Sequence, residues 1–239
     1  MVVALLTAAG MGTRMGQDIP KQFLHVENKP LIIHTMEAFQ KHPSVDYIML
    51  VTLTAWIPVV EAYAKQFGIN KLRWIVPGGS TGQESIYNGL VGLSKDLKDN
   101  DVVMVHDGNR CMVSQEIISN SLAIFHAYGS AVAAIPCVEA IFRSTDGVSS
   151  STMIPREELF RTQTPHTYTL KKLLWAHEEA KKRNITNTVA SCTLMQILGE
   201  TIYFSKGAES NLKITTVDDV RIFKALLHEK NEAWLKNAE

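Results

Sequence analysis

Short apolar runs that end in glycine-containing or polar turns constrain the fold of this chain most strongly. The first run, residues 2–7, is apolar and rich in β-branched residues, which is typical of a strand buried on both faces of a parallel sheet. Stretches with helical periodicity separate successive runs, and the connections are short. The predicted strands are residues 2–7, 47–53, 73–76, 101–105, 131–136 and 201–204, and the predicted helices are residues 30–42, 58–67, 85–93, 114–127, 170–183 and 217–236. This alternation predicts an α/β fold with a doubly wound sheet that has helices on both faces.

The alternation stops between residues 138 and 160. This segment contains Glu139, Arg143, the turn pair Asp146-Gly147 and a cluster of serines and threonines, a pattern that predicts a β-hairpin. A hairpin that leaves a compact sheet is suited either to dimerisation or to covering a site. We therefore expect the 239 residues to form one domain, with residues 138–160 as an arm.

Some predicted helices carry recognisable end signals. Ser114 is expected at the N-cap of the helix over 114–127, and Gly129 is expected just past its end. For the C-terminal helix, a capping box is supplied either by Thr215 with Asp218 or by Thr216 with Asp219.

The charge balance excludes some classes of partner. Lysine and arginine number 24, as do aspartate and glutamate, so the net charge is zero. A globally basic nucleic-acid binder and a polybasic membrane-surface protein are therefore not expected. The N-terminal apolar run lacks a basic flank and enters a glycine-rich turn, so we interpret it as a strand and not as a signal peptide. The longest uncharged run, residues 117–138, is interrupted by polar residues, glycine and proline, which fits a helix, a turn and a strand better than a membrane span.

The three cysteines point to a reducing compartment. Cys111, Cys137 and Cys192 are far apart, and their spacing matches neither a zinc site nor a disulfide framework. We therefore expect a cytoplasmic location. The histidines likewise show no metal-binding spacing, and no nucleophile elbow supports a hydrolase.

A glycine-rich loop follows the first strand and is the first candidate for chemistry. Glycines at this position let backbone N–H groups approach a phosphate closely. The loop matches neither the Walker A motif nor the dinucleotide fingerprint. Arg14 and Lys21 are expected to converge on a bound polyphosphate, as phosphoryl and nucleotidyl transfer require. A tight turn with solvated Arg14 and Lys21 is the alternative. The candidate nucleotide-binding residues of this loop are Ala8, Ala9, Gly10, Gly12 and Thr13.

Three further segments could complete a site at the carboxyl edge of the sheet. Asp107 follows a buried strand and could hold Mg²⁺ beside substrate phosphates, or it could cap its own turn. Arg110 could bind a second phosphate or lie on the surface. A second glycine-rich loop, with Gly79 and Ser85, could contact a nucleobase or form a simple turn. Lys213 precedes a helix N-terminus, where a lysine favours a bound anion, although snorkelling of its stem is the alternative.

The combination of these segments is specific. The motifs are AAGMGTRMG followed by PKQFL, HD-x-x-R at 106–110, RTQTPH at 161–166 and NLKITTVDD at 211–219. With them the chain resembles, end to end, the CTP-dependent cytidylyltransferases typified by 2-C-methyl-D-erythritol 4-phosphate cytidylyltransferase, a group that includes the ribitol 5-phosphate cytidylyltransferases. The loop and its PK pair are shared with many sugar-nucleotide pyrophosphorylases, whereas PKQFL with QTP and N-x-K-I-T narrows the match to the cytidylyl branch. The resemblance implies a Rossmann-like mixed sheet and a homodimer in which a protruding β-arm of each subunit embraces the other subunit.

The resemblance also implies a reaction and roles for residues. A polyol phosphate attacks the α-phosphorus of CTP and releases pyrophosphate, without a covalent enzyme intermediate. Arg14, Lys21 and Lys213 would be the catalytic cations, and Asp107 would position Mg²⁺. Gly79 and Ser85 would help to select cytosine. The implied acceptor-binding positions are Arg110, Glu139, Ala140, Arg156 and Thr186, with Arg110 and Arg156 reaching the acceptor phosphate across the dimer.

Departures from the family pattern fall mainly on the acceptor side. The methylerythritol enzymes usually read HDAARP where this chain has Asn109 and Cys111, and an Asp-Thr pair where it has Glu139-Ala140. Asn187-Thr188 replaces acidic residues, and Gly82 replaces a loop arginine. We infer retained nucleotide chemistry with a changed acceptor preference. The alternatives are a catalytically degenerate nucleotide-binding or regulatory protein and a sugar-1-phosphate nucleotidyltransferase.

Overall fold

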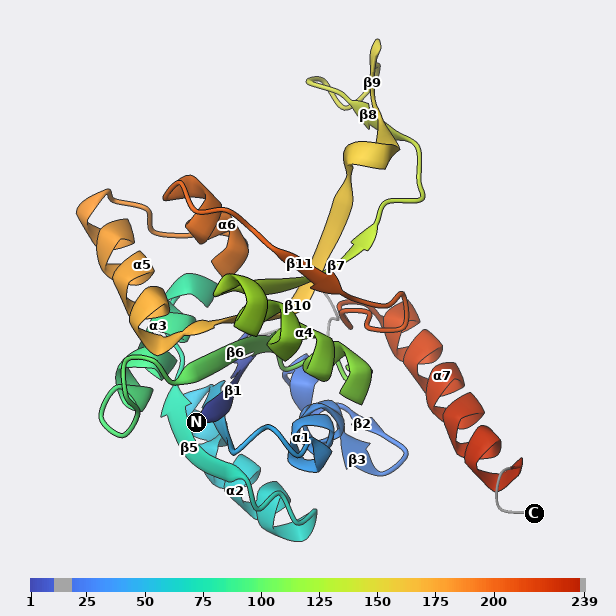
Figure 1. Ribbon diagram of the computed structural model, residues 1–239. Coiled ribbons are helices and arrows are strands. Elements are labelled where there is room, and N and C mark those ends of the chain that lie inside the picture. Colours follow the sequence, from blue (N-terminus) through green and yellow to red (C-terminus); the bar gives the residue numbers. More distant parts are fainter. Residues whose placement is uncertain (11–18, 237–239) are drawn as a thin grey trace.

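A seven-stranded mixed sheet forms the centre of the protein in the computed structural model, which describes residues 1–10 and 19–236 (Figure 1). The strand order is β11-β7-β10-β6-β1-β4-β5. Strand β10 runs antiparallel to both of its neighbours, and the other pairs are parallel. The strands are β1 (Val2–Ala8), β4 (Tyr47–Thr52), β5 (Leu72–Pro77), β6 (Val102–Asp107), β7 (Ala131–Pro136), β10 (Phe160–Thr169) and β11 (Phe204–Lys206). The predicted α/β fold with a doubly wound mixed sheet is confirmed.

Helices cover both faces of the sheet because its strands alternate their side chains between two apolar cores. In β1, Ala4 and Leu6 enter one core, whereas Val3 and Leu5 enter the other. Helices α1, α2 and α4 pack on the first face, and α3, α5 and α6 pack on the second. The bounds are α1 (Leu31–Lys41), α2 (Ile57–Gln66), α3 (Gly82–Leu93), α4 (Gln115–Tyr128), α5 (Leu170–Lys182), α6 (Ser191–Ile197) and α7 (Val217–Lys236). Over the described residues, none of these helices combines the length and apolar character that a membrane crossing needs.

The expected helix ends are present. The Ser114 hydroxyl accepts from the Ile117 N–H at the start of α4, and Gly129 ends that helix with φ of 80°. At the start of α7, the Asp219 N–H donates to the Thr216 hydroxyl and the Asp219 carboxylate accepts from the Thr216 N–H, which is the second of the two capping boxes considered.

Three elements of the sheet and its cover differ from the sequence prediction. Strand β10 was not expected, because its central residues are polar and include Pro165. These residues are nevertheless buried, since neighbouring groups satisfy them: the Thr167 hydroxyl, for example, pairs with that of Ser121 at 2.7 Å. Helix α6 was also not expected. The last strand was predicted at 201–204 but forms at Phe204–Lys206, where it pairs with β7.

The segment over 138–160 contains the predicted hairpin, which stands well away from the sheet (Figure 1). Its strands are β8 (Ile141–Arg143) and β9 (Thr152–Ile154), paired antiparallel. Asp146 shapes the turn, because its carboxylate accepts from the Val148 and Ser149 N–H groups. Phe142 and Met153 lie opposite each other in the hairpin, and their exposed fractions are 59% and 57%. Two large apolar side chains are thus exposed on a projecting element.

Candidate active site

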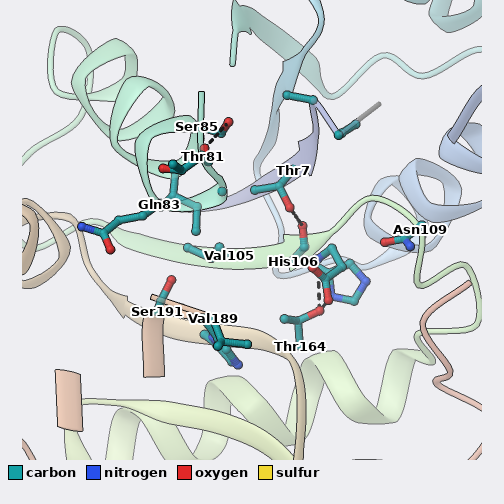
Figure 2. A pocket seen from close by; sticks show the side chains of 18 of the residues that line it. Thr7, Thr81, Gln83, Ser85, Val105, His106, Asn109, Thr164, Val189 and Ser191 are labelled. Atoms are coloured by element: carbon teal, nitrogen blue, oxygen red, sulfur yellow. Dashed lines mark hydrogen bonds between the residues drawn. The ribbon is translucent and has the colours of Figure 1, made fainter. Parts of the chain in front are cut away.

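A cavity of about 730 Å³ opens at the carboxyl ends of β1 and β6 (Figure 2). Parallel strands of a doubly wound sheet end at the same edge, which is where such folds bind ligands. The walls come from the loop after β1, the turn after β5 with the start of α3, the middle of β10, and the loop that leads into α6. Segments that are distant in sequence therefore meet around one space.

Asp107 is the electrostatic centre of this cavity. It ends β6, and its two carboxylate oxygens face two cations. The Lys213 Nζ lies 2.9 Å from Oδ1, and the Arg110 Nε lies 3.0 Å from Oδ2. Burial alone would raise the pKa of Asp107, but Lys213 and Arg110 outweigh burial and hold that pKa well below its usual range. Asp107 is therefore ionised, and it forms ion pairs with two cations at the carboxyl end of β6.

Hydrogen bonds between β10 and the loop before α7 fix the position of Lys213. The Asn211 side chain donates to the Thr164 carbonyl at 2.9 Å, and the Arg110 Nη1 donates to the Asn211 carbonyl at 2.7 Å. Gln163 binds the Ala208 carbonyl of the same loop at 2.8 Å. The RTQTPH segment and the NLKITT segment, both noted in the sequence, are therefore joined to each other by hydrogen bonds.

Asn109, which departs from the family pattern, also helps to position the segment that carries Lys213. Its side chain donates to the Ile214 carbonyl, and the Ile214 N–H donates back to the Asn109 carbonyl at 3.0 Å. Asn109 is 5% exposed, so both bonds are shielded from water. The residue thus ties the turn after β6 to the segment that carries Lys213.

His106 and His166 line the cavity, are almost fully buried and are neutral. Burial lowers the pKa of each to about 4. The His106 Nδ1 contacts the Thr164 hydroxyl at 3.0 Å, and its Nε2 contacts the Arg110 carbonyl at 3.2 Å. With both ring nitrogens engaged, His106 acts as a structural residue, as expected for a histidine outside a metal-binding pattern.

The loop after β1 contributes its backbone to the cavity. Ala8, Ala9, Gly10 and Lys21 line it, and the Gln22 side chain donates to the Ala8 carbonyl at 2.6 Å. The predicted site residues Gly12, Thr13 and Arg14 lie outside the described residues.

The turn after β5 packs directly against this loop. A Cβ added to Gly78 would lie 2.2 Å from the Ala9 Cβ, so only glycine allows this approach. The Gly79 N–H donates to the Ser85 hydroxyl at 3.0 Å, and that hydroxyl donates to the Thr81 carbonyl at 2.9 Å. Gly79 and Ser85 both line the cavity, and together they shape the wall next to Ala9.

The remaining residues that were predicted to bind the acceptor lie away from this cavity. Glu139, Ala140 and Arg156 are exposed and belong to the arm, where the Arg156 Nη1 donates to the Val138 carbonyl at 3.3 Å. Thr186 is exposed and does not line the cavity, whereas Thr188 does. Arg110 alone among the predicted acceptor-binding residues is a cavity residue.

Sequence reasoning missed several lining residues, notably Gln83, His177, Thr188 and Ser191. Gln83 had a signal, since it lies in the glycine-rich segment that was singled out. Thr188 was noted as a departure from the family pattern, but not as a cavity residue. His177 and Ser191 had no signal, because they face the cavity only through the packing of α5 and α6 beside α3.

Comparison with known proteins agrees with the sequence and the geometry. The family model of 2-C-methyl-D-erythritol 4-phosphate cytidylyltransferase matches residues 2–229. The chain is 39% identical to a ribitol-5-phosphate cytidylyltransferase from Lacticaseibacillus paracasei, over 96% of this chain and 99% of that protein. It is 37% identical to a 2-C-methyl-D-erythritol 4-phosphate cytidylyltransferase from Clostridium botulinum, over 93% and 96% of the two chains.

A solved structure gives the same fold. The crystal structure of 4-diphosphocytidyl-2C-methyl-D-erythritol synthase from Anaerococcus prevotii superposes with a TM-score of 0.80 at 21% identity, and the match covers 95% of this chain and 96% of that one. The sequence motifs, the mixed sheet and the full-length matches lead to one conclusion: the chain belongs to the 2-C-methyl-D-erythritol 4-phosphate cytidylyltransferase family.

Proposed function

We propose that the protein transfers a cytidylyl group from CTP to a polyol phosphate and releases pyrophosphate. The observation that carries this proposal is the pairing of Lys213 and Arg110 on Asp107, beside two glycine-rich turns at the carboxyl edge of the sheet. An oxygen of the acceptor phosphate attacks the α-phosphorus of CTP. The bond from that phosphorus to the oxygen bridging the β-phosphate breaks, and pyrophosphate leaves with the electron pair.

Cations are the main catalytic requirement of this reaction, because negative charge accumulates on the phosphoryl oxygens in the transition state. Lys213 and Lys21 line the cavity and would supply this charge together with Arg14. The acceptor phosphate is already an anion near pH 7, with a second pKa of about 6, so it needs no general base. The neutral, hydrogen-bonded state of His106 agrees with this requirement.

Mg²⁺ fits the proposed site through one protein ligand. Among the described residues that line the cavity, Asp107 is the only acid, and no described group of three histidines, cysteines or acids could form a protein cage. Mg²⁺ is commonly held by one or two carboxylates together with substrate phosphates, so a single carboxylate is sufficient. When bound, the ion would neutralise the phosphates of CTP. Phosphate oxygens would at the same time offer Lys213 and Arg110 an alternative to Asp107.

We propose a homodimer in which each arm serves the partner's acceptor site. The exposed Phe142 and Met153 of the arm support this assembly, since an apolar pair of this kind is suited to an interface. Arg156, which does not line the cavity of its own subunit, would then reach the acceptor phosphate of the other. The three free cysteines are buried, in keeping with a reducing cytoplasmic setting.

Pyrophosphate release tests the proposal. The assay contains CTP, Mg²⁺ and one acceptor from a panel of 2-C-methyl-D-erythritol 4-phosphate, ribitol 5-phosphate, erythritol 4-phosphate and glucitol 6-phosphate. We expect turnover with at least one acceptor and little with UTP or GTP in place of CTP. CTP binding without pyrophosphate release would favour a regulatory protein, and a preference for UTP or GTP with a sugar 1-phosphate would favour the other alternative.

A further inference from the structure

One wall of the cavity contains buried polar atoms for which the proposed reaction gives no role. The Nε2 of His177, on α5, and the hydroxyl of Ser191, the first residue of α6, have no hydrogen-bond partner among the described residues. The two residues are 3% and 4% exposed, and both line the cavity. Figure 2 shows the Ser191 hydroxyl pointing into the space beside Gln83 and Val105. Buried polar groups are normally paired, so two orphaned atoms on one wall point to a ligand.

The loop that leads to Ser191 is held in place by Gln83. The Gln83 Nε2 donates to the Ile185 carbonyl at 2.7 Å. The Gln83 Oε1 accepts from the Thr188 N–H at 2.9 Å and from its hydroxyl at 3.1 Å. Gln83 is 8% exposed, so these three bonds are partly buried. Gln83 is therefore a positioning residue, and the wall is formed before any ligand arrives.

The wall is electrically neutral, which distinguishes it from the Asp107 end. Burial, with a smaller contribution from Lys181, lowers the pKa of His177 to about 4, so the ring is neutral near pH 7. Lys181 itself packs over the Tyr87 ring at 3.6 Å. A neutral imidazole and a hydroxyl suit a neutral group that both donates and accepts. A phosphate suits the opposite end, where Arg110 and Lys213 lie.

We propose that His177 and Ser191 bind hydroxyl groups of the acceptor's polyol chain and select acceptors that present a hydroxyl there. This inference rests on the proposed function. The nucleotide has its own wall, formed by the loop after β1 and the turn with Gly79 and Ser85. The acceptor is the other substrate, and its carbon chain bears several neutral hydroxyls. We refer to the pair of His177 and Ser191 as the hydroxyl subsite.

The first test combines Ser191→Ala with acceptors that each lack one hydroxyl. With the preferred acceptor, we expect kcat/KM to fall about tenfold, the effect of one lost hydrogen bond, while the KM for CTP stays unchanged. One monodeoxy acceptor should already be about tenfold worse for the wild-type enzyme. That same acceptor should lose little further in Ser191→Ala, because the missing partner is the same.

The second test separates the His177 ring from its nitrogen. His177→Phe keeps an aromatic ring beside Tyr87 and removes Nε2, so it should lower acceptor kcat/KM about tenfold. His177→Gln places an amide nitrogen near the same position and should recover most of that loss. Ser205→Ala is the matched control: Ser205 also has a buried hydroxyl without a described partner, but it lies on β11 outside the cavity. Its kinetics should equal those of the wild-type enzyme.

Other outcomes overturn the inference in distinguishable ways. If Ser191→Ala loses the same factor with every monodeoxy acceptor, the residue is only structural. If the KM for CTP rises and 2′- or 3′-deoxy-CTP abolishes the difference, the subsite belongs to the nucleotide ribose. Unchanged kinetics in Ser191→Ala and His177→Phe refute the subsite while the active wild-type enzyme upholds the proposed function. A wild-type enzyme that is inactive with the whole acceptor panel refutes both the hydroxyl subsite and the proposed function.

Discussion

At the scale of single residues, one carboxylate organises the charges of the site. Asp107 holds Lys213 and Arg110 on opposite oxygens, so both cations are in place before a polyphosphate arrives. A cation that is fixed in advance needs little reorganisation when charge develops in the transition state. The side chain of Lys213 is 44% exposed, and it can therefore transfer from Asp107 to a phosphate without leaving water completely.

Removal of Lys213 tests this arrangement. We expect Lys213→Ala to lower kcat at least a hundredfold, because the lost charge acts on the transition state. The melting temperature should change little, since Asp107 keeps its contact with Arg110. Lys206→Ala, an exposed lysine outside the cavity, is the control and should retain wild-type kcat. A Lys213→Ala enzyme with kcat within twofold of wild type would show that the lysine is not catalytic.

Sequence reasoning located some residues of the site because chain order fixes their position. Asp107 and Gly79 each follow a parallel strand, and the carboxyl ends of parallel strands meet at one edge whatever the details of packing. No comparable rule places His177. It lies on an amphipathic helix whose apolar face was evident, but its contact with the cavity depends on how α5 sits beside α3.

At the scale of elements, β10 shows why a buried strand with polar residues is not predicted from hydrophobic periodicity. Hydrophobic periodicity reports burial only when buried residues are apolar. In β10 the buried side chains Gln163, Thr164 and Thr167 are satisfied by groups from other elements, including His106 and Ser121. Those partners lie between 46 and 58 residues away in sequence. A local sequence pattern therefore cannot predict these hydrogen-bond partners.

The arm carries a prediction about assembly. Changing Phe142 and Met153 together to serine should turn the proposed dimer into a monomer, because these side chains are opposite each other and exposed. Size-exclusion chromatography with light scattering measures the mass directly. Ile222→Ser, a half-exposed apolar residue of α7, is the control and should leave the dimer intact. A double variant that remains dimeric would remove the arm from the interface.

At the scale of the whole molecule, the cavity divides into two parts with different chemistry. The loops after β1 and β5 present backbone groups and glycines, which suit a nucleotide. The residues from β6, β10 and the segment before α6 present an ion-paired carboxylate at one end and neutral polar groups at the other. The family's motifs map to both parts: PKQFL follows the loop after β1, whereas HD-x-x-R begins on β6 and RTQTPH lies on β10. Among the departures, Asn109 and Thr188 line the second part and Gly82 lines the first, whereas Glu139 and Ala140 lie on the arm, outside the cavity. The motifs therefore predict the reaction, whereas the acceptor depends on positions at which this chain departs from the family.

Acid sensitivity is a property of the whole fold. Burial lowers the pKa of His106, His166 and His177 to about 4, whereas unfolded histidine titrates near 6.5. Between these values the unfolded chain binds more protons, so the free energy of unfolding falls as pH falls from about 6.5 to about 4. Each histidine contributes up to ~1.4 kcal/mol per pH unit in this window and nothing further above pH 7.5.

Denaturation with urea at pH 7.5, 6.5 and 5.5 measures this effect. We expect little change between pH 7.5 and 6.5 and a marked loss at pH 5.5. Asp107 does not contribute there: its pKa is lowered by Lys213 and Arg110, so the stability it provides is lost only as pH falls below about 4. His177→Gln should reduce the slope, because one of the titrations disappears; His34 and His42, whose pKa values are also lowered by burial, contribute to the slope that remains. A free energy of unfolding that stays flat down to pH 5 would mean that the three rings are protonated in the folded protein.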